Sequence, residues 1–217
     1  MVNIDTKSDE HFENQAIWLK KLFYKYKARR LVIDGNGVGM GLMDFMVKPQ
    51  VDPDTLEEYP DFGVYGGTQE DAAQEYKKFR TDVTEQEAIY ILKANAPINT
   101  EAHSNALVQL SSGKVKMLQD ERIAKQKLLG TKVGQNMTPE QRADYLKPFT
   151  LTSILKEEMM NLREENEGVN IILKQANKGI KKDKFSAFEY GLYWIKLEED
   201  KKRKRNKKRF SDMLFMN

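Results

Sequence analysis

Asp34 is the residue whose position most directly suggests chemistry. It follows the aliphatic run Leu31-Val32-Ile33 and precedes a glycine-rich segment that extends from Gly35 to Gly41. The aliphatic run predicts a short buried strand, and a carboxylate at the tip of an apolar strand is costly to bury without compensation. A divalent cation would compensate it. The alternative is an aspartate that accepts hydrogen bonds from backbone N–H groups of the glycine-rich turn, and both interpretations stay open.

The glycine-rich segment does not match a nucleotide-binding motif. The last position of the G-x-G-x-x-G/A fingerprint is neither Gly nor Ala when the motif is started at Gly35, Gly37 or Gly39, and no GxxxxGK[ST] phosphate loop occurs in the chain. The sequence therefore predicts no self-sufficient ATPase. The glycines instead favour a tight turn from strand to helix that a backbone or a polymer can approach closely.

A second carboxylate, Asp183, lies among lysines at the predicted start of the last helix. One interpretation is a helix N-cap, which is worth about 1 kcal/mol. The other is a second metal ligand at the carboxyl edge of a sheet, with nearby lysines that hold a phosphate backbone. Those candidate DNA-binding residues are Lys181, Lys182 and Lys184. Ser186 and Glu189, one turn further on, are weaker candidates for the same role as Asp183.

Composition limits the metals and the chemistry that the chain can use. It has 217 residues with no cysteine and two histidines, so zinc–thiolate and His-rich sites are excluded. Carboxylate oxygens would be the ligands, which favours Mg²⁺, Mn²⁺ or Ca²⁺. Two carboxylates at one sheet edge would suit two-metal phosphodiester hydrolysis, although such sites need three or more. We interpret Asp44 as a residue behind the ligands or on the surface, His103 as a helix-surface histidine, and Trp18 and Trp194 as core or interface aromatics.

The basic residues are concentrated at the C-terminus. The stretch 201–209 holds 8 of the 36 basic residues, and without it 28 basic residues face 33 acidic ones. We therefore separate residues 1–200, a mildly acidic domain, from 201–217, a basic tail. The tail could contact nucleic acid or an acidic partner, or it could be a solvated helix end. No apolar run approaches the roughly 20 residues of a membrane span, so no membrane partner is expected.

The elements that position these residues follow from hydrophobic periodicity and from turn residues. We expect a helix over 10–28, the strand that ends at Asp34, a short helix stopped near Pro49, and a polar surface excursion over 47–87. A strand over 88–93 and a helix from 99 or 100 to 111 come next. The second half is predicted to contain a helix that starts at the capping box of Thr138, a break at Pro148, a helix ended by Gly168, a strand over 169–174, and a long helix from Asp183. The inward face of this last helix is predicted to contain Phe185, Phe188, Leu192 and Ile195. This alternation predicts an α/β fold with at least partly parallel strands, in which ligands gather beyond the carboxyl ends.

Several segments of the sequence together resemble a known protein family. Val32-Ile-Asp34-Gly-Asn-Gly37-Val-Gly39, with Leu42 and Asp44 beyond, resembles the central segment of the nuclease domain of tailed-phage large terminase subunits. Lys182-Asp183-Lys-Phe-Ser-Ala187 resembles that domain's C-terminal acidic motif. The segments 88–95 and 146–149 fit the same family. The likeness extends from about Glu10 to Glu199, and it rests on the order and spacing of short motifs.

The resemblance implies an RNase H-like (RuvC-like) fold and a metal-dependent endonuclease that cuts concatemeric viral DNA during packaging. It implies Asp34 and Asp183 as the second and third carboxylates of a two-metal Mg²⁺ or Mn²⁺ site. Its partners would be double-stranded DNA, the portal protein, the small terminase subunit and an N-terminal ATPase part absent from this chain, all in the host cytoplasm.

The family's first acid lies on an early strand that this chain lacks, and Val2-Asn-Ile4 would be the last strand of its hairpin. We therefore expect an N-terminally truncated fragment with an incomplete sheet, which could be inactive alone. The alternatives are another RNase H-like nuclease or resolvase and a non-enzymatic fragment that binds DNA or an assembly.

Overall fold

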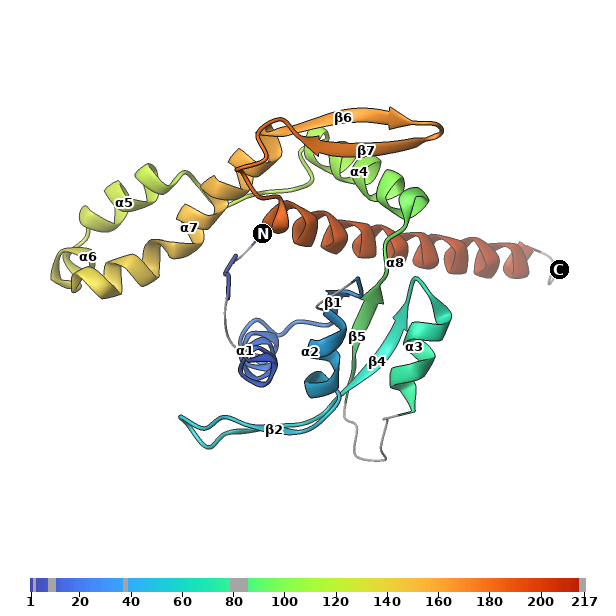
Figure 1. The fold of residues 1–217 in the computed structure, drawn as a ribbon, viewed down its shortest axis with the longest axis horizontal. Coiled ribbons are helices and arrows are strands. Elements are labelled where there is room, and N and C mark those ends of the chain that lie inside the picture. The colour runs from blue at the N-terminus through green and yellow to red at the C-terminus, as the bar shows by residue number, and fades with distance from the viewer. Residues whose placement is uncertain (2, 8–10, 37–38, 79–85, 215–217) are drawn as a thin grey trace. The chain divides into compact units, whose positions relative to one another are not determined.

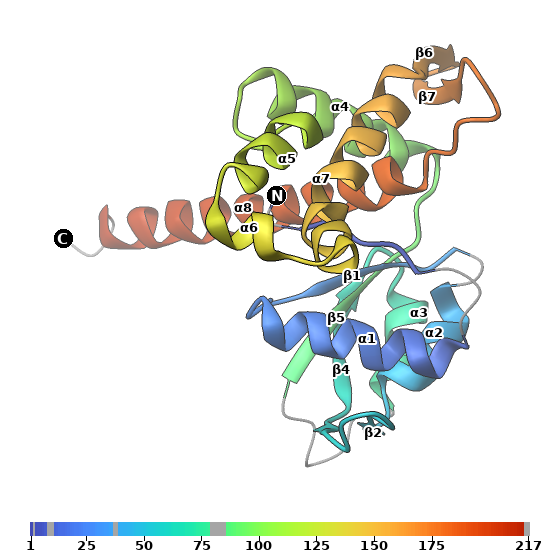
Figure 2. The same ribbon diagram turned by 90° about the vertical axis from the view of Figure 1, so that its left-hand side faces the viewer.

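The structure is a computed structural model that describes residues 1, 3–7, 11–36, 39–78 and 86–214, without the side chains of residues 72 and 208–214. The chain divides into two compact units, and each is described by itself (Figures 1 and 2). The sheet unit is Lys7–Ile98. The helical unit combines Met1–Thr6 with Asn99–Asn217. This division falls inside the predicted domain 1–200.

The sheet unit is built on three parallel strands in the order β1-β5-β4. These are β1 (Leu31–Asp34), β4 (Phe62–Gly67) and β5 (Gln86–Leu92). Three helices and a short antiparallel hairpin complete the unit: α1 (Phe12–Lys25), α2 (Gly39–Met46), α3 (Glu70–Lys77), β2 (Gln50–Val51) and β3 (Glu58–Tyr59). The parallel sheet and its helices confirm the predicted α/β class.

The hydrophobic core of the unit is built around the central strand β5. Leu31 is paired with Ile89 and Ile33 with Ile91, so these four residues share a face because side chains alternate along a strand. Buried residues of all three helices complete the cluster: Ala16, Phe23, Met43, Met46, Ala73 and Tyr76. Full burial of a large apolar side chain contributes roughly 1.5–3 kcal/mol, so this cluster is the main source of the unit's stability.

The predicted helix over 10–28 and the predicted strands at 31–34 and 88–93 are confirmed, with small shifts at their ends; Glu10 lies outside the described residues. The surface excursion over 47–87 is wrong, because β4 lies within it and its Phe62 and Val64 are buried. Glycines at 63, 66 and 67 interrupt the apolar run, and the pairing of β4 with β5 is irregular beside them. A strand at Val2-Asn-Ile4 is also wrong: Asn3 and Ile4 lie in no strand, and Val2 is outside the described residues.

The helical unit contains most of α4 (Ala96–Ser111), which begins in the sheet unit, together with α5 (Glu121–Leu129), α6 (Lys132–Asn136), α7 (Pro139–Met160) and α8 (Asp183–Leu214). The hairpin of β6 (Leu162–Glu167) and β7 (Asn170–Gln175) joins α7 to α8. The predicted capping box is confirmed. Gln141 N–H donates to Thr138 Oγ1 at 3.2 Å, and Thr138 N–H donates to Gln141 Oε1 at 3.0 Å.

Two predictions for this unit are wrong, and one is confirmed. Helix α7 continues through Pro148, and the buried Leu151 and Leu155 anchor the residues that follow it. Gly168 ends no helix; its φ of +61° makes the turn between β6 and β7, which suits a residue without a Cβ. The predicted strand over 169–174 is confirmed as β7, which pairs antiparallel with β6 in a sheet of its own.

Helix α8 begins at Asp183 as predicted and passes residue 200 without a break. Its inward face differs from the prediction. Among the described side chains of α8, the predicted Phe185 is buried together with Glu189 and Tyr193, whereas Ile195 is 46% exposed. The charged Glu189 therefore takes a position that apolar periodicity had assigned to neighbouring residues.

Candidate metal and nucleic-acid site

Asp34 lies at the carboxyl end of β1 with an exposed carboxylate. Its Oδ1 accepts a hydrogen bond from Asn36 N–H at 2.9 Å, and Gly35 N–H donates to the Leu92 carbonyl at 2.8 Å. The turn interpretation of Asp34 is therefore confirmed. It does not use up the side chain, because an ionised carboxylate has about four lone-pair sites and the turn occupies one. Asp34 can hold the turn and still offer oxygen to a cation.

The glycines beside Asp34 are required by close packing of the backbone. A Cβ added at Gly39 would lie 1.8 Å from the Asp34 carbonyl oxygen, and one at Gly35 would lie 2.7 Å from Ile91 Cγ2. Both distances are far below van der Waals contact. A side chain at Gly39 would therefore require the backbone to shift, and one at Gly35 would require the Ile91 and Lys93 side chains to move. This confirms the predicted tight strand-to-helix turn. Gly37 and Val38, in the middle of the quoted motif, lie outside the described residues.

The other two strand ends present polar groups to the same edge of the sheet. Thr68 follows β4, and its hydroxyl accepts from Lys93 N–H at 2.8 Å and donates to the Lys93 carbonyl at 2.9 Å. Asn36 Nδ2 donates to the Ala94 carbonyl at 3.3 Å. Sequence reasoning missed Thr68 because β4 was not predicted. Asp34 supplies the edge with a carboxylate, while Thr68 and Asn36 hold the strand ends together.

Asp183 is exposed and is the first residue of α8. The N-cap interpretation is not borne out, because within the described part of the chain its carboxylate has no recorded hydrogen bond. A carboxylate from α7 binds the start of α8 instead. Glu158 Oε2 accepts a hydrogen bond from Phe185 N–H at 2.9 Å, and Glu158 Oε1 forms an ion pair with Lys184 Nζ at 3.3 Å. Glu158 is 2% exposed. The Asp183 carboxylate is thus free of a capping role, as a metal ligand at this position would need to be.

The three lysines around Asp183 differ in how available they are. Lys184 is paired with Glu158, and Lys182 Nζ donates to the Leu173 carbonyl at 3.4 Å. Lys181 is exposed and has no recorded partner among the described residues. Of the predicted DNA-binding lysines, Lys181 is therefore the one whose charge is directed at no other group of the described chain.

Two further polar residues of the sequence analysis have partners. His103 Nδ1 and Glu189 Oε2 are 2.7 Å apart, and the His103 side chain is 12% exposed, so the prediction of a helix-surface histidine is wrong. The same contact occupies Glu189, one of the weaker ligand candidates. The Tyr76 hydroxyl donates to the exposed Asp44 at 3.4 Å, and burial, assisted by that carboxylate, raises the pKa of Tyr76 to about 12.

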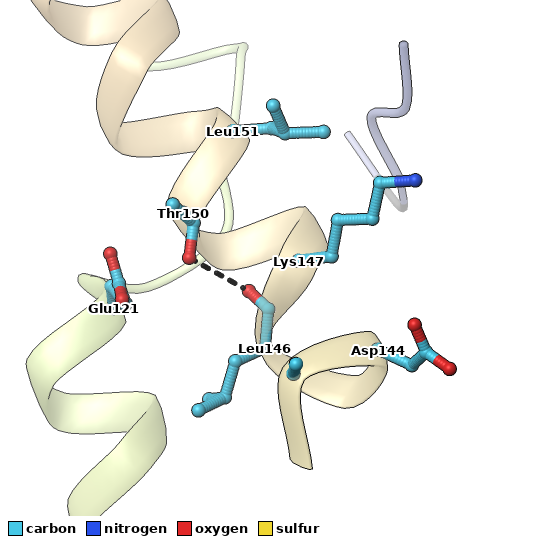
Figure 3. A pocket seen from close by; sticks show the side chains of 7 residues that line it. Glu121, Asp144, Leu146, Lys147, Thr150 and Leu151 are labelled. Atoms are coloured by element: carbon cyan, nitrogen blue, oxygen red, sulfur yellow. Dashed lines mark hydrogen bonds between the residues drawn. The ribbon is translucent and has the colours of Figure 1, made fainter. Parts of the chain in front are cut away.

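A pocket of about 410 Å³ lies between α5 and α7 in the helical unit. Figure 3 shows Glu121 on one side and Leu146, Thr150 and Leu151 on the other, with the Thr150 hydroxyl bonded to the Leu146 carbonyl at 3.3 Å. None of the predicted site residues lines it. The pocket is therefore not evidence for the predicted site.

The structure does not assemble a complete metal site within one unit. Asp34 belongs to the sheet unit and Asp183 to the helical unit. Over the described residues, no group of three or more His, Asp or Glu side chains is positioned to hold a metal ion. Each unit thus contains one of the two predicted carboxylates.

Comparisons with protein-family models, with curated proteins and with solved structures find no match to this chain. Among the described residues, no helix combines the length and the apolar character needed to cross a membrane.

Proposed function

We propose that this chain is the C-terminal nuclease portion of a large terminase subunit of a tailed phage, with an RNase H-like fold. The position of Asp34 carries the proposal. It places an exposed carboxylate at the carboxyl end of a parallel strand, where ligands of α/β sheets bind, beside a turn whose backbone leaves no room for a Cβ at Gly39. The order of the motifs around Asp34 and Asp183 is the second support.

The unpaired side of the outer strand β1 supports the view that the chain is a fragment. Among the described residues, β1 has a strand neighbour on one side, β5. An unpaired strand edge offers N–H and C=O groups to a further strand. We infer that the strand with the family's first acid adds beside β1 and brings a third carboxylate next to Asp34. Upstream polypeptide or another chain would supply it.

In the completed site, Asp34, Asp183 and the added acid would hold Mg²⁺ or Mn²⁺, cations that prefer oxygen ligands. The metals would activate water and stabilise the leaving oxygen as DNA is cut. Double-stranded DNA would be the substrate. The portal protein, the small terminase subunit and an ATPase part would be partners in the host cytoplasm.

Binding of Mn²⁺, measured by its effect on water proton relaxation, tests the proposal even if the fragment does not cut DNA. We expect weaker binding in Asp34→Asn and Asp183→Asn than in the wild type. Asp71→Asn and Asp144→Asn, which change exposed acids of the same two units, are the matched controls. Any cleavage of supercoiled plasmid should be lost in the first pair and kept in the second. Unchanged Mn²⁺ binding in Asp34→Asn would refute the metal site.

A second candidate is a non-enzymatic fragment that binds DNA or an assembly. It is favoured by the hydrogen bond that already gives the Asp34 carboxylate a structural role in its turn. This candidate predicts no effect of Mn²⁺ on thermal stability, whereas a specific site should add about 2.7 kcal/mol at a metal concentration of 100 Kd. Another RNase H-like nuclease or resolvase would share the metal chemistry. A phosphate-binding loop in the upstream reading frame would favour the terminase.

A further inference from the structure

The C-terminal half of α8 is a strongly basic surface. Residues 201–207 include six lysines and arginines, and every one of the seven side chains is exposed. Both views show this part of α8 extending past the other helices and the hairpin of its own unit (Figures 1 and 2). We call residues 201–207 the basic segment. It is a regular helix, so the directions of its charges are fixed by the helical repeat.

Acidic residues neutralise only the start of the basic segment. Lys201 Nζ forms an ion pair with Glu198 Oε1 at 2.9 Å. The guanidinium of Arg203 forms two longer ion pairs, from Nη2 to Glu199 Oε2 at 3.9 Å and from Nη1 to Asp200 Oδ1 at 4.0 Å. The next turn contains no acid. No ion pair is recorded within the described part of the chain for four of the basic residues: Lys202, Lys204, Arg205 and Lys207.

These four charges form two pairs on opposite sides of the helix. Residues three apart lie on one side, which groups Lys202 with Arg205 and Lys204 with Lys207. Each step of two residues turns the helix by about 200°, since a residue turns it by about 100°. The first pair therefore points away from the second. A flat anionic surface could contact only one pair at a time.

The partner must then present anionic groups on two sides of a helix. The major groove of B-form DNA is about 12 Å wide, it admits an α-helix of about 10–12 Å diameter, and phosphates line both of its walls. The major groove of A-form RNA is too narrow and deep. An amphipathic membrane helix needs an apolar face, and the basic segment has no apolar residue.

We propose that the basic segment lies in the major groove of B-form DNA, with Lys202 and Arg205 at one phosphate wall and Lys204 and Lys207 at the other. The proposal rests on the proposed function for its substrate, duplex DNA, but it requires no metal and no cleavage. The contacts are to phosphates, so binding does not depend on base sequence. The segment would hold the helical unit on DNA wherever the nuclease acts.

Salt-dependent binding to a 20-bp duplex of random sequence, in EDTA, tests this with the full chain. Each lost phosphate contact lowers the slope of log K against log salt by about 0.9. We expect K202Q/R205Q and K204Q/K207Q each to lower it by about 1.8, and the quadruple variant by about 3.6. Glutamine keeps helix propensity near that of lysine. The control K114Q/K132Q removes two exposed lysines elsewhere in the helical unit and should leave the slope unchanged.

The ligands distinguish the possible partners. Duplex DNA should bind at least tenfold more tightly than duplex RNA of the same length, polyglutamate or anionic phosphatidylserine vesicles. Equal binding of RNA, preference for polyglutamate or vesicles, or a loss confined to one of the two pairs would overturn the groove proposal. Because metal is absent, such a failure leaves the Mn²⁺ test of Asp34 and Asp183 standing. Failure of that test leaves the groove proposal standing in turn.

Discussion

The sheet unit and the helical unit differ in the proportion of apolar and polar side chains that they bury: most buried residues of the sheet unit are apolar, and polar residues make up a larger share in the helical unit. The sheet unit encloses large apolar residues such as Met43, Phe62 and Ile91. Among the buried residues of the helical unit are Thr152, Glu158 and Glu189, each with a hydrogen-bond partner. An apolar core depends on area and fit, whereas buried polar groups depend on particular partners. The two units should therefore respond differently to substitution.

The two tryptophans allow each unit to be followed separately. Trp18 lies in the sheet unit and Trp194 in the helical unit, and the sequence has no others. In Trp194→Phe the fluorescence reports on the sheet unit, and in Trp18→Phe it reports on the helical unit. The predictions below use these two backgrounds in urea denaturation.

The largest effect is expected from Phe62→Ala in the sheet unit. Phe62 is fully buried and its ring lies 4.8 Å from that of Phe23. The lost burial and the remaining cavity should lower the free energy of unfolding by about 4 kcal/mol, read from Trp18. Val51→Ala, at a residue 52% exposed in the same unit, is the control and should change it by less than about 0.5 kcal/mol. Equal effects of the two would contradict an apolar core centred on Phe62.

In the helical unit, Glu158→Ala should lower the free energy of unfolding by about 3 kcal/mol, because it leaves Phe185 N–H and the Lys184 ammonium without their acceptor. Trp194 fluorescence gives the measurement. The neighbouring Glu157→Ala changes an exposed carboxylate and should have little effect. If the two variants were equally stable, the buried Glu158 carboxylate would not stabilise the helical unit through its partners.

Lys20 is one of the buried polar residues of the sheet unit: it is 0% exposed, and its ammonium donates to the Lys48 carbonyl at 2.6 Å. Burial lowers the pKa of its ammonium from 10.5 to about 8, and the Asp61 carboxylate offsets part of this. Above pH 8 the folded unit loses a proton that the unfolded chain retains up to its higher pKa. Stability should therefore rise between pH 8 and 9.5, by about 2 kcal/mol.

Lys20→Met should abolish this rise, and Lys25→Met, at an exposed lysine of the same helix, should keep it. The range stops at pH 9.5 because tyrosines act in the opposite direction above it. Burial raises the pKa of Tyr59 to about 12, so the unfolded chain deprotonates first and stability falls. A flat profile in the wild type would show that Lys20 stays charged when buried.

The sequence predicted what local patterns determine. The aliphatic runs of β1 and β5, the periodicity of α1 and the start of α8 all appear near their expected positions. The elements that were predicted wrongly are determined by residues far away in the sequence. Packing of Leu151 and Leu155 carries α7 through Pro148, and glycines hide β4 in the sequence although Phe62 and Val64 bury it.

The candidate site follows the same rule. The turn at Asp34 could be predicted, because a carboxylate followed by glycines forms it locally. That the Asp183 carboxylate does not cap α8 could not be predicted, because it depends on Glu158, 25 positions earlier, which accepts the hydrogen bond from Phe185 N–H. The contact between His103 and Glu189 joins α4 to α8 and leaves no local pattern either.

The smallest effect tests whether a local signal also matters in the helical unit. Thr138→Ala removes the hydroxyl that accepts Gln141 N–H at the start of α7, and should lower the free energy of unfolding by about 1 kcal/mol, read from Trp194. Thr138→Ser keeps the hydroxyl and should restore most of the loss. If Thr138→Ala cost as much as Glu158→Ala, capping of α7 would matter as much as the buried carboxylate. The contrast between local and distant determinants would then not hold for this unit.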